Sequence, residues 1–341
     1  MELPFLKNRP PRDSYSVGLD IGTSGVKAAK LKFSEGAVEL VDFRIEPVSG
    51  GLPSAVKKIA EALGIKQVNL SASGTSGLLR YVDFPKMSKA ELSGALKFEA
   101  DKHIPFPINE VNLDSHILKQ DVASGKMKVL LAAVKKDFVG QQLKIVKDNT
   151  QATVNLFDLD SVAIINAFNF NYSTDSKEAS GTPVALLNIG AYVANLNILE
   201  HGVPVLSRDL RIAGNDFTQK ISDILGVEFS QAEGLKINPQ EDKIDKITMA
   251  VDSVLANLSA EVRTSFDYYE SQGASSVSKV FLSGGGSNFA PLPEKLSGLL
   301  GIQAELWDPV IRIKQAPGVR GRLSKGVSGQ LAVAIGLALR R

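Results

Sequence analysis

Two segments that lie far apart in the chain follow the same pattern. Residues 18–31 read "GLDIGTSGVKAAKL" and residues 186–199 read "LLNIGAYVANLNIL". In each, an apolar strand runs into an acid or its amide (Asp20 or Asn188), then into Ile-Gly, two small or polar residues and a second strand. Because the two copies open the two halves of the chain, they indicate an internal duplication and therefore two related domains.

Each turn can be read in two ways: as an ordinary hairpin turn, or as a turn whose backbone amides hold a phosphate. Gly22 and Gly190 carry no side chain, so successive N–H groups can approach an anion closely. The hydroxyls of Thr23 and Ser24 can add donors. One such hairpin is weak evidence, but two copies favour a phosphate site.

A glycine triplet supports this interpretation. In "KVFLSGGGSNFAPLPEKL", residues 279–296, an apolar strand ends just before Gly284, Gly285 and Gly286, and a proline-flanked helix follows. Three glycines lose much conformational entropy on folding, which is costly if they only make a turn. They suit a place where the backbone must lie flat against a ligand.

Two further segments complete the set. In "AEGLK", Glu233 and Lys236 are spaced i, i+3, so both side chains extend from one helix face. They can contact a ligand, or they can form a surface ion pair worth about 0.5 kcal/mol at best. Near the end of the chain, "GQLAVAIGLALR" predicts a closing helix of small residues.

Composition excludes several classes of function. With 44% hydrophobic and 22% charged residues and a formal net charge of +2, the chain shows no field that would favour nucleic acid or a membrane surface. Cysteine is absent, which excludes disulfides and thiolate metal sites. No segment has the roughly 20 apolar residues of a spanning helix, and the proline-rich start lacks the apolar core of a signal peptide.

The pattern of elements predicts an α/β protein of two domains with an insertion. A capping box at Ser88 and Glu91 opens a helix after residue 84, and two strands and a second helix follow up to residue 149. The predicted parts are a flexible arm (1–14), a first domain (15–84, 150–180 and 326–341), an inserted subdomain (85–149) and a second domain (181–325) whose helical subdomain covers about 227–275.

Taken in order, these features resemble the actin-like ATPase fold of actin, heat-shock chaperones, sugar kinases, MreB and FtsA. In detail the chain resembles the PilM family, cytoplasmic actin-like proteins of type IV pilus assembly. Much of that likeness lies in "RYVDFPKMSKAEL" (80–92) and "FEADKHIPFPINEVNLDSHIL" (98–118), which are similar to the extra subdomain of PilM and FtsA. The resemblance runs from about Tyr15 to the C-terminus.

The resemblance implies that ATP with Mg²⁺ lies between the two duplicated domains. Gly22, Thr23 and Ser24 would face the phosphates, and Asp20 would lie near the metal and its waters. For Lys27 two roles stay open: it can contact a phosphate, or it can simply begin the second strand.

From the other domain, the resemblance implies that Gly190 and Ala191 supply backbone amides. Glu233 and Lys236 would contact the ribose and base, and the glycines at 284–286 would support the adenosine.

At Asn188 the chain departs from the family, which commonly has aspartate there. Asparagine keeps the shape and one acceptor but loses the anion and any role as a proton acceptor. Because positioning and electrostatics dominate phosphoryl transfer, we expect hydrolysis to suffer more than binding. The hypothesis is a protein that binds ATP and hydrolyses it slowly or not at all, so no catalytic residue is assigned.

Two alternatives stay open. A sugar-kinase-like phosphotransferase shares the fold but needs a catalytic base, and neither Asp83 nor Asp160 fits that role well, the latter being a helix-start residue. A cell-division membrane tether like FtsA carries a separate amphipathic helix that binds the bilayer. This sequence stops at "LALRR", so we expect no direct membrane insertion.

The resemblance favours a cytoplasmic scaffold that is peripheral to the inner membrane through its partner. In PilM proteins the N-terminal tail of the membrane protein PilN lies in a groove between the first domain and the inserted subdomain, within an inner-membrane pilus assembly complex. An exposed strand edge suits such peptide capture. The residues predicted to contact the peptide are Arg80, Phe84, Leu92 and Phe106.

Overall fold

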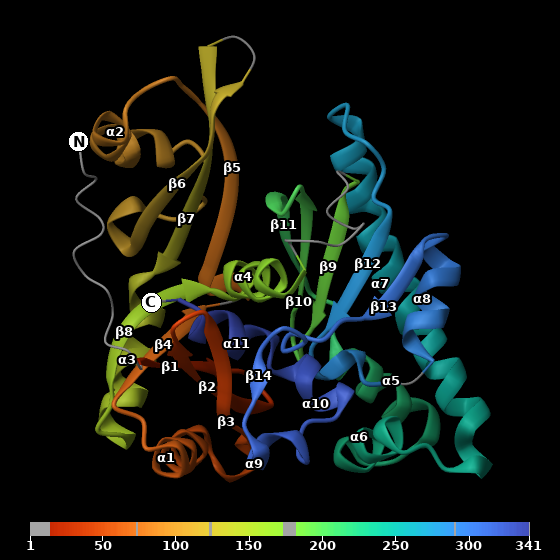
Figure 1. Cartoon of the computed structure of the whole chain (residues 1–341). Helices are drawn as coiled ribbons and strands as arrows, with labels where there is room; N and C mark the ends of the chain where they lie inside the picture. The colour runs from red at the N-terminus through yellow and green to blue at the C-terminus, as the bar shows by residue number, and fades with distance from the viewer. Residues whose placement is uncertain (1–13, 73, 123–124, 173–181, 290, 341) are drawn as a thin grey trace.

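The computed structural model describes residues 14–72, 74–122, 125–172, 182–289 and 291–340 (Figure 1). The predicted arm, except its last residue, and most of the polar spacer at 171–183 lie outside the described residues. Figure 1 shows two sheets side by side, with a smaller sheet standing above the first of them.

The first sheet is built on the first hairpin. Its order is β14-β3-β2-β1-β4-β8; β1, β2 and β3 form an antiparallel meander, and β4 lies parallel to both β1 and β8. A helix beside this sheet is capped by Gly64, whose φ of +56° is the left-handed conformation of a glycine cap. The elements are β1 (Ser14–Ile21), β2 (Gly25–Ser34), β3 (Ala37–Pro47), α1 (Leu52–Leu63), β4 (Gln67–Ala72), α3 (Lys136–Asn149), β8 (Thr153–Leu159) and β14 (Lys314–Gln315).

The second sheet repeats this arrangement. Its order is β11-β10-β9-β12-β13, again an antiparallel meander followed by parallel strands on the other side of the first strand. This repetition agrees with the internal duplication that the two hairpins predict. The elements are β9 (Val184–Ile189), β10 (Ala194–Glu200), β11 (Val203–Leu210), α5 (Gly214–Leu225), α6 (Phe229–Ile237), α7 (Ile244–Ser271), β12 (Lys279–Ser283), α8 (Leu292–Leu300) and β13 (Gln303–Leu306).

The third sheet belongs to the insertion and has the order β5-β7-β6. It consists of β5 (Gly77–Pro85), β6 (Val111–Val122) and β7 (Lys126–Lys135), with α2 (Lys89–Ala100) beside it. Because β5 pairs with β7 along its whole length, this sheet starts at Gly77, before the predicted boundary at 85. At the other end of the predicted insertion, α3 packs Val146 into the core of the first sheet next to α1.

Two helices lie between the two large sheets, near the centre of the molecule (Figure 1): α4 (Asp160–Tyr172) and α11 (Ala332–Ala338). A Cβ on Gly336 would lie 1.8 Å from the carbonyl oxygen of Ala163, so only glycine lets α11 lie this close to α4. The core around these helices includes Leu31 of the first sheet and Phe281 of the second, so both domains share it. The remaining short helices are α9 (Pro317–Arg320), α10 (Lys325–Gln330) and the 3₁₀ turns η2 (Val48–Gly50), η3 (Gly74–Ser76), η4 (Ile108–Glu110), η7 (Glu241–Lys243) and η8 (Gly285–Ser287).

Within the described part of the chain, none of the helices combines the length and the apolar character that crossing a membrane requires.

Candidate functional site

The first hairpin holds a charged pair beside its turn. Asp20 and Lys27 face each other in the register of β1 and β2, and Lys27 Nζ lies 3.1 Å from Asp20 Oδ2, with both side chains largely buried. A Cβ on Gly22 would lie 2.7 Å from that ammonium and 2.9 Å from the carbonyl oxygen of Gly25. Lys27 therefore lies within β2 and also places its charge at the turn.

The two hydroxyl residues of this turn are free to meet a ligand. Thr23 and Ser24 are exposed at its tip, whereas Gly25 and Val26, which follow at the start of β2, are buried. The backbone carbonyl of Ser24 accepts a hydrogen bond from the Val48 amide at 3.1 Å, which fixes the turn to the end of β3. The turn thus presents its side-chain donors to solvent on a fixed backbone.

The second hairpin turn is fixed to the start of a helix. The Gly190 amide, predicted to face a phosphate, donates within the turn to the Val193 carbonyl at 3.0 Å. The carbonyls of Gly190 and Ala191 accept from the amides of Gly214 and Asn215 at 2.9 and 2.7 Å. These are the first residues of α5, so the turn satisfies two of the N–H groups that a helix leaves unpaired at its N-terminus.

Asn188 lies at the centre of a buried polar chain. Its Oδ1 accepts from the Ser283 hydroxyl at 3.1 Å, and its Nδ2 donates to Asn195 Oδ1 at 3.3 Å. Asn195 Nδ2 in turn donates to Asp209 at 2.6 Å, and the backbone amide of Gly74 donates to the same carboxylate. Burial raises the pKa of Asp209, although both hydrogen bonds oppose that effect. The amide of Asn188 is therefore committed on both sides.

The glycine triplet lies against the second hairpin. Gly284 has φ of +88°, and a Cβ there would lie 2.3 Å from the carbonyl oxygen of Ile189. A Cβ on Gly286 would lie 2.5 Å from the Ile189 side chain. Gly285 is less restricted, because its nearest neighbour is the side chain of Gln330 at 3.7 Å. Gly284 and Gly286 therefore allow the backbone of the glycine triplet to lie directly against the second hairpin.

In the Glu233–Lys236 ion pair the lysine is buried, so the pair is not an ordinary surface ion pair. Lys236 Nζ donates to Glu233 at 2.7 Å, to the Thr218 hydroxyl at 2.7 Å and to the Gly214 carbonyl at 3.2 Å, and its side chain is 10% exposed. The Thr218 hydroxyl also hydrogen bonds to Glu233. These bonds tie α6 to the start of α5, while the glutamate stays 40% exposed.

Gly214 is the point where the second-domain features meet, and sequence reasoning missed it. A Cβ there would lie 2.9 Å from the Gly190 carbonyl and 3.5 Å from the Gly286 backbone, and its own carbonyl accepts from Lys236. Its signal in the sequence was small: a glycine at the start of a helix, in "AGND". The structure thus brings the second hairpin, the glycine triplet and the Glu233–Lys236 pair together.

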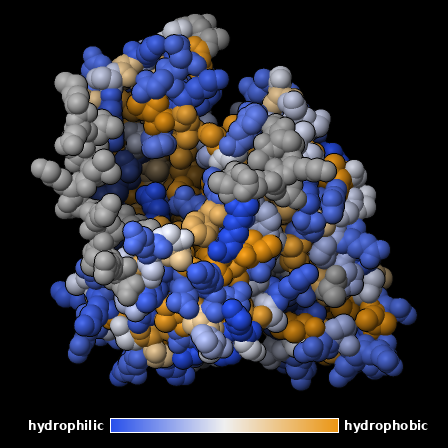
Figure 2. All heavy atoms as spheres, viewed as in Figure 1, coloured by the Kyte–Doolittle hydropathy of each residue, from blue (hydrophilic) through white to orange (hydrophobic). Residues whose placement is uncertain are grey.

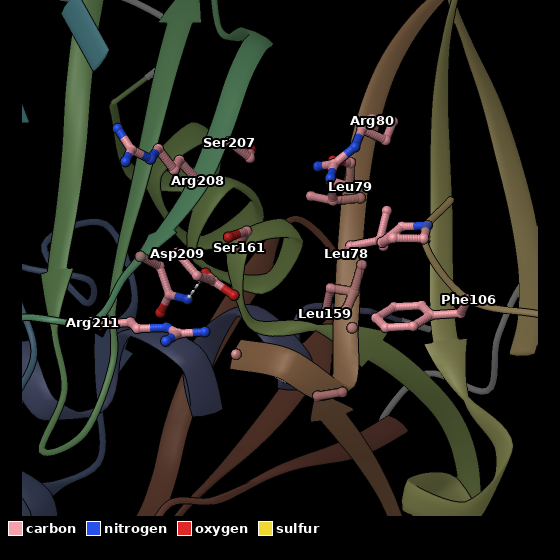
Figure 3. A pocket seen from close by; sticks show the side chains of 15 residues that line it. Leu78, Leu79, Arg80, Phe106, Leu159, Ser161, Ser207, Arg208, Asp209 and Arg211 are labelled. Atoms are coloured by element: carbon pink, nitrogen blue, oxygen red, sulfur yellow. Dashed lines mark hydrogen bonds between the residues drawn. The ribbon is translucent and has the colours of Figure 1, made fainter. Parts of the chain in front are cut away.

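A separate cavity of about 440 Å³ opens between the insertion and the second domain. Figure 2 shows the surface hollowed here, with apolar residues in the hollow, and Figure 3 shows β5 on one side and β11 on the other. Its walls are Ala72, Gly74, Gly77, Leu78, Leu79, Arg80, Pro105, Phe106, Leu159, Ser161, Asn195, Ser207, Arg208, Asp209 and Arg211.

Among the described residues, two hydrogen bonds beside this cavity join η3 and β5 to the second domain. One is the bond from Gly74 to Asp209 described above. The other joins the Tyr81 hydroxyl to Ser207 Oγ at 2.8 Å; because Ser207 donates its own proton to Asn197 at 2.6 Å, Tyr81 is the donor. Burial raises the pKa of Tyr81 to about 12, which keeps this donor protonated.

The structure divides the four residues predicted to contact a peptide. Arg80 is exposed and Phe106 half-buried, and both line the cavity. Phe84 and Leu92 are 1% and 2% exposed in the insertion's core, packed with Met127, so direct contact with a peptide is wrong for these two. Their apolar character reflects the packing of α2 on the sheet.

The candidate bases of the kinase alternative have other partners. Asp83 pairs with Lys128 at 2.5 Å on the surface of the insertion. Asp160 is the first residue of α4, as predicted, and accepts the Ser71 hydroxyl at 2.5 Å.

Comparison with known proteins agrees with this architecture. The family described as "Type IV pilus assembly protein PilM" matches residues 18–341. A solved "PilM-PilN type IV pilus biogenesis complex" matches with a TM-score of 0.83 and 26% identity, covering 97% of this chain and 99% of that one. The ethanolamine utilization protein EutJ from Carboxydothermus hydrogenoformans matches with a TM-score of 0.54 and 13% identity, covering 97% and 90%.

A more distant sequence match is to the chaperone protein DnaK of Gracilaria tenuistipitata var. liui. It is 24% identical over 275 residues and covers 73% of this chain, which spans only 44% of that relative's length. Together the structural matches confirm the predicted actin-like ATPase fold. Because the family match covers almost the whole chain, the protein belongs to the PilM family of type IV pilus assembly proteins.

Proposed function

We propose that this protein is a nucleotide-binding scaffold of type IV pilus assembly that captures the N-terminal tail of a PilN-type inner-membrane protein. The observation that carries the proposal is the cavity of about 440 Å³ beside β5. The similarity to a chain solved in a complex described as PilM-PilN, over 97% of this protein, supports it. In this role the protein is cytoplasmic and attached to the membrane through its partner.

The cavity has the features that peptide capture needs. β5 is an edge strand of its sheet, so alternate backbone groups along Gly77–Pro85 point away from β7 and can pair with an extended peptide. Leu78 and Phe106, both half-buried on the cavity wall, offer apolar contact for its side chains. The volume lies within the range of about 300–1,000 Å³ that is usual for binding pockets.

Binding of a synthetic peptide tests the proposal. The probe is the N-terminal tail of the PilN protein of the same organism, followed by fluorescence anisotropy. We expect Arg80→Glu, on the cavity wall, to weaken binding at least tenfold. The matched control is Lys119→Glu, an exposed charge reversal on β6 at the far edge of the same sheet, which should leave affinity within twofold. Equal affinity of both variants and the wild type would place the peptide site elsewhere.

For the nucleotide we propose ATP with Mg²⁺, held by the first hairpin turn and the cluster around Gly214. The exposed hydroxyls of Thr23 and Ser24 and the charge of Lys27 suit phosphates, and Asp20 suits the water shell of a magnesium ion. The 40% exposed Glu233 carboxylate can accept from a ribose hydroxyl. Native mass spectrometry of the purified protein tests this directly, because a bound nucleotide adds its own mass and that of its metal.

We propose further that hydrolysis is slow or absent. Asn188 lacks a charge, so its amide cannot accept a proton as an aspartate would, and one acceptor and one donor position of that amide are already used by Ser283 and Asn195. Single-turnover assays with radiolabelled ATP should show loss of far less than one equivalent per hour. Turnover at the rate of a working ATPase would refute this, whereas Asn188→Asp should raise any residual rate.

The two alternatives make different predictions. A sugar-kinase-like enzyme would transfer phosphate to a member of a sugar panel, and a tether like FtsA would bind lipid vesicles without a partner. We expect neither activity. The partners of Asp83 and Asp160 argue against the kinase.

A further inference from the structure

The cavity lies at the same edge of the sheets as the two hairpin turns. The register of β1 and β4, which are parallel, places their last residues level, with Ile21 just before the first turn and Ala72 on the cavity wall. From the other domain, Val193 of the second turn would lie 3.3 Å from a Cβ on Gly74, which also lines the cavity. Ligands of α/β sheets bind outside the carboxyl ends of parallel strands. The cavity therefore adjoins the place proposed for the nucleotide phosphates.

Positive charge predominates around this cavity. Its lining residues include three arginines, Arg80, Arg208 and Arg211, but a single acid, Asp209. Arg208 is bound to Glu261 of α7 at 2.6 Å. Arg211 forms neither a hydrogen bond nor an ion pair with any residue that the structure describes. Its guanidinium group is therefore available to a ligand that carries negative charge.

The backbone that carries Arg211 also positions the second turn. Arg211 follows Leu210, the last residue of β11, and precedes by three residues Gly214, where α5 begins. The first amides of α5 hydrogen bond to the carbonyls of the second turn. Figure 3 shows the Arg211 side chain extending from the end of β11 toward β5, below Asp209 in that view. The guanidinium group thus has a fixed starting point beside the cavity.

The first domain contributes the start of α4 to the cavity. Ser161 lines it and is only 7% exposed, yet its hydroxyl has no hydrogen-bond partner within the described part of the chain. Because buried hydroxyls are usually hydrogen bonded, this one can donate to a ligand in the cavity. Ser161 also lies in the first turn of a helix of 13 residues, where the unpaired backbone N–H groups favour an anion.

The acid of the cavity does not neutralise these donors. The Asp209 carboxylate accepts from Asn195 at 2.6 Å and from the Gly74 amide, and burial raises its pKa. Its oxygens are thus engaged within the protein, and Arg211 forms no ion pair with it. The guanidinium group on one side and the Ser161 hydroxyl on the other remain as donors to an added ligand.

We infer that the end of the cavity between Arg211 and Ser161 is an anion site that takes a phosphate group. The guanidinium group donates to phosphate oxygens through several N–H groups at once, and the Ser161 hydroxyl donates to another oxygen. The phosphate is either the terminal one of a nucleotide held at the hairpin turns or free inorganic phosphate. The site lies apart from the β5 wall proposed for the peptide, and it rests on the proposed function only in the choice of phosphate as the anion.

Isothermal titration calorimetry of the full-length protein tests the inference with inorganic phosphate, Mg-ADP and Mg-AMP-PNP. If the site holds the terminal phosphate, Arg211→Ala should weaken AMP-PNP binding about tenfold or more and leave ADP binding within about twofold. If it holds free phosphate, the ADP-bound wild type should bind inorganic phosphate and Arg211→Ala should lose that binding, with both nucleotide affinities unchanged.

Two further variants separate a local site from a general effect of charge or folding. Ser161→Ala should weaken the same ligand about threefold or more. Lys246→Ala removes an exposed positive charge from α7 of the same domain and should change affinity less than about twofold. Circular dichroism spectra confirm that each variant is folded.

The outcomes also separate this inference from the proposed nucleotide site. Unchanged binding of all three ligands by Arg211→Ala overturns the inference, as does equal weakening of ADP and AMP-PNP, because a contact to the terminal phosphate affects only AMP-PNP. In either case the proposed nucleotide site stands if the wild type binds a nucleotide. If the wild type binds phosphate through Arg211 but neither nucleotide, the nucleotide proposal fails and the inference stands; if it binds none of the three ligands, both fail.

Discussion

Asn188→Asp tests whether the polar chain at the second hairpin requires an amide. In the wild type, Asn188 Nδ2 donates to Asn195 Oδ1 at 3.3 Å, and Asn195 cannot turn its amide round without losing its 2.6 Å bond to Asp209. The substitution removes the donor, at about 1 kcal/mol, and leaves a buried carboxylate oxygen facing a carbonyl oxygen, at about 1–3 kcal/mol more. We therefore expect a loss of about 2–4 kcal/mol in the free energy of unfolding at pH 7.

The loss of stability caused by Asn188→Asp should depend on pH. Burial should raise the pKa of the introduced carboxyl above its value in the unfolded chain, so its contribution to stability falls as the pH rises through that range. Protonation supplies a hydrogen in place of the lost N–H. The deficit relative to the wild type should thus shrink between pH 7 and pH 5.

Urea unfolding followed by the fluorescence of the single tryptophan, Trp307, measures the effect, because this side chain is only 3% exposed in the folded protein. Asn109→Asp, at an exposed position of η4, is the matched control and should cost less than about 0.5 kcal/mol. A stability of Asn188→Asp within 0.5 kcal/mol of the wild type at both pH values would refute the reasoning. Magnesium with ATP should reduce the deficit if the acid then meets the metal.

Three other predictions concern the packing around the two sites. Lys236→Met should lower the free energy of unfolding by about 1–3 kcal/mol in the same urea assay. This is less than a fully buried ion pair would lose, because its partner Glu233 is 40% exposed. Lys246→Met, at an exposed position, should be nearly neutral. Gly336→Ala should lower the free energy of unfolding by about 3 kcal/mol or more, because the added carbon would lie 1.8 Å from a carbonyl oxygen. Its control, Gly298→Ala in α8, meets nothing within 4 Å and should raise the free energy of unfolding by about 0.5–1 kcal/mol. Equal thermal midpoints of the two variants would contradict the close crossing of α4 and α11. Tyr81 should ionise near pH 12 rather than 10 in an ultraviolet titration of the folded protein. The unfolded chain then loses this proton first, so the free energy of unfolding should fall as the pH rises from about 10 to 12. Tyr81→Phe should remove this part of the pH dependence, and ionisation at pH 10 would show that the hydroxyl is exposed.

Local patterns predicted much of the fold. The capping box of Ser88 and Glu91 and the start of α4 at Asp160 are both found as predicted. These features depend on contacts between residues a few positions apart, so their spacing in the sequence is sufficient. The two hairpins and their duplication followed from the same kind of pattern.

The partners of the site residues could not be predicted in this way. Glu233 and Lys236 were correctly placed on one helix face, but whether the lysine was buried depended on Thr218 and Gly214 of another helix. Phe84 and Leu92 are large apolar residues, which suit a binding surface as well as a core, and the structure places them in the core of the insertion.

Periodicity and turn chemistry act over short distances, so the order of residues alone was enough to indicate two related α/β halves, two glycine-containing hairpin turns and an insertion. Which side chains meet at the second hairpin, and which residues enclose the cavity, depends on how the sheets pack together. Ser283 and Asn188 are 95 positions apart, and Tyr81 and Ser207 are 126 positions apart. Such pairs form only when the sheets are placed relative to one another by the shared core around α4 and α11.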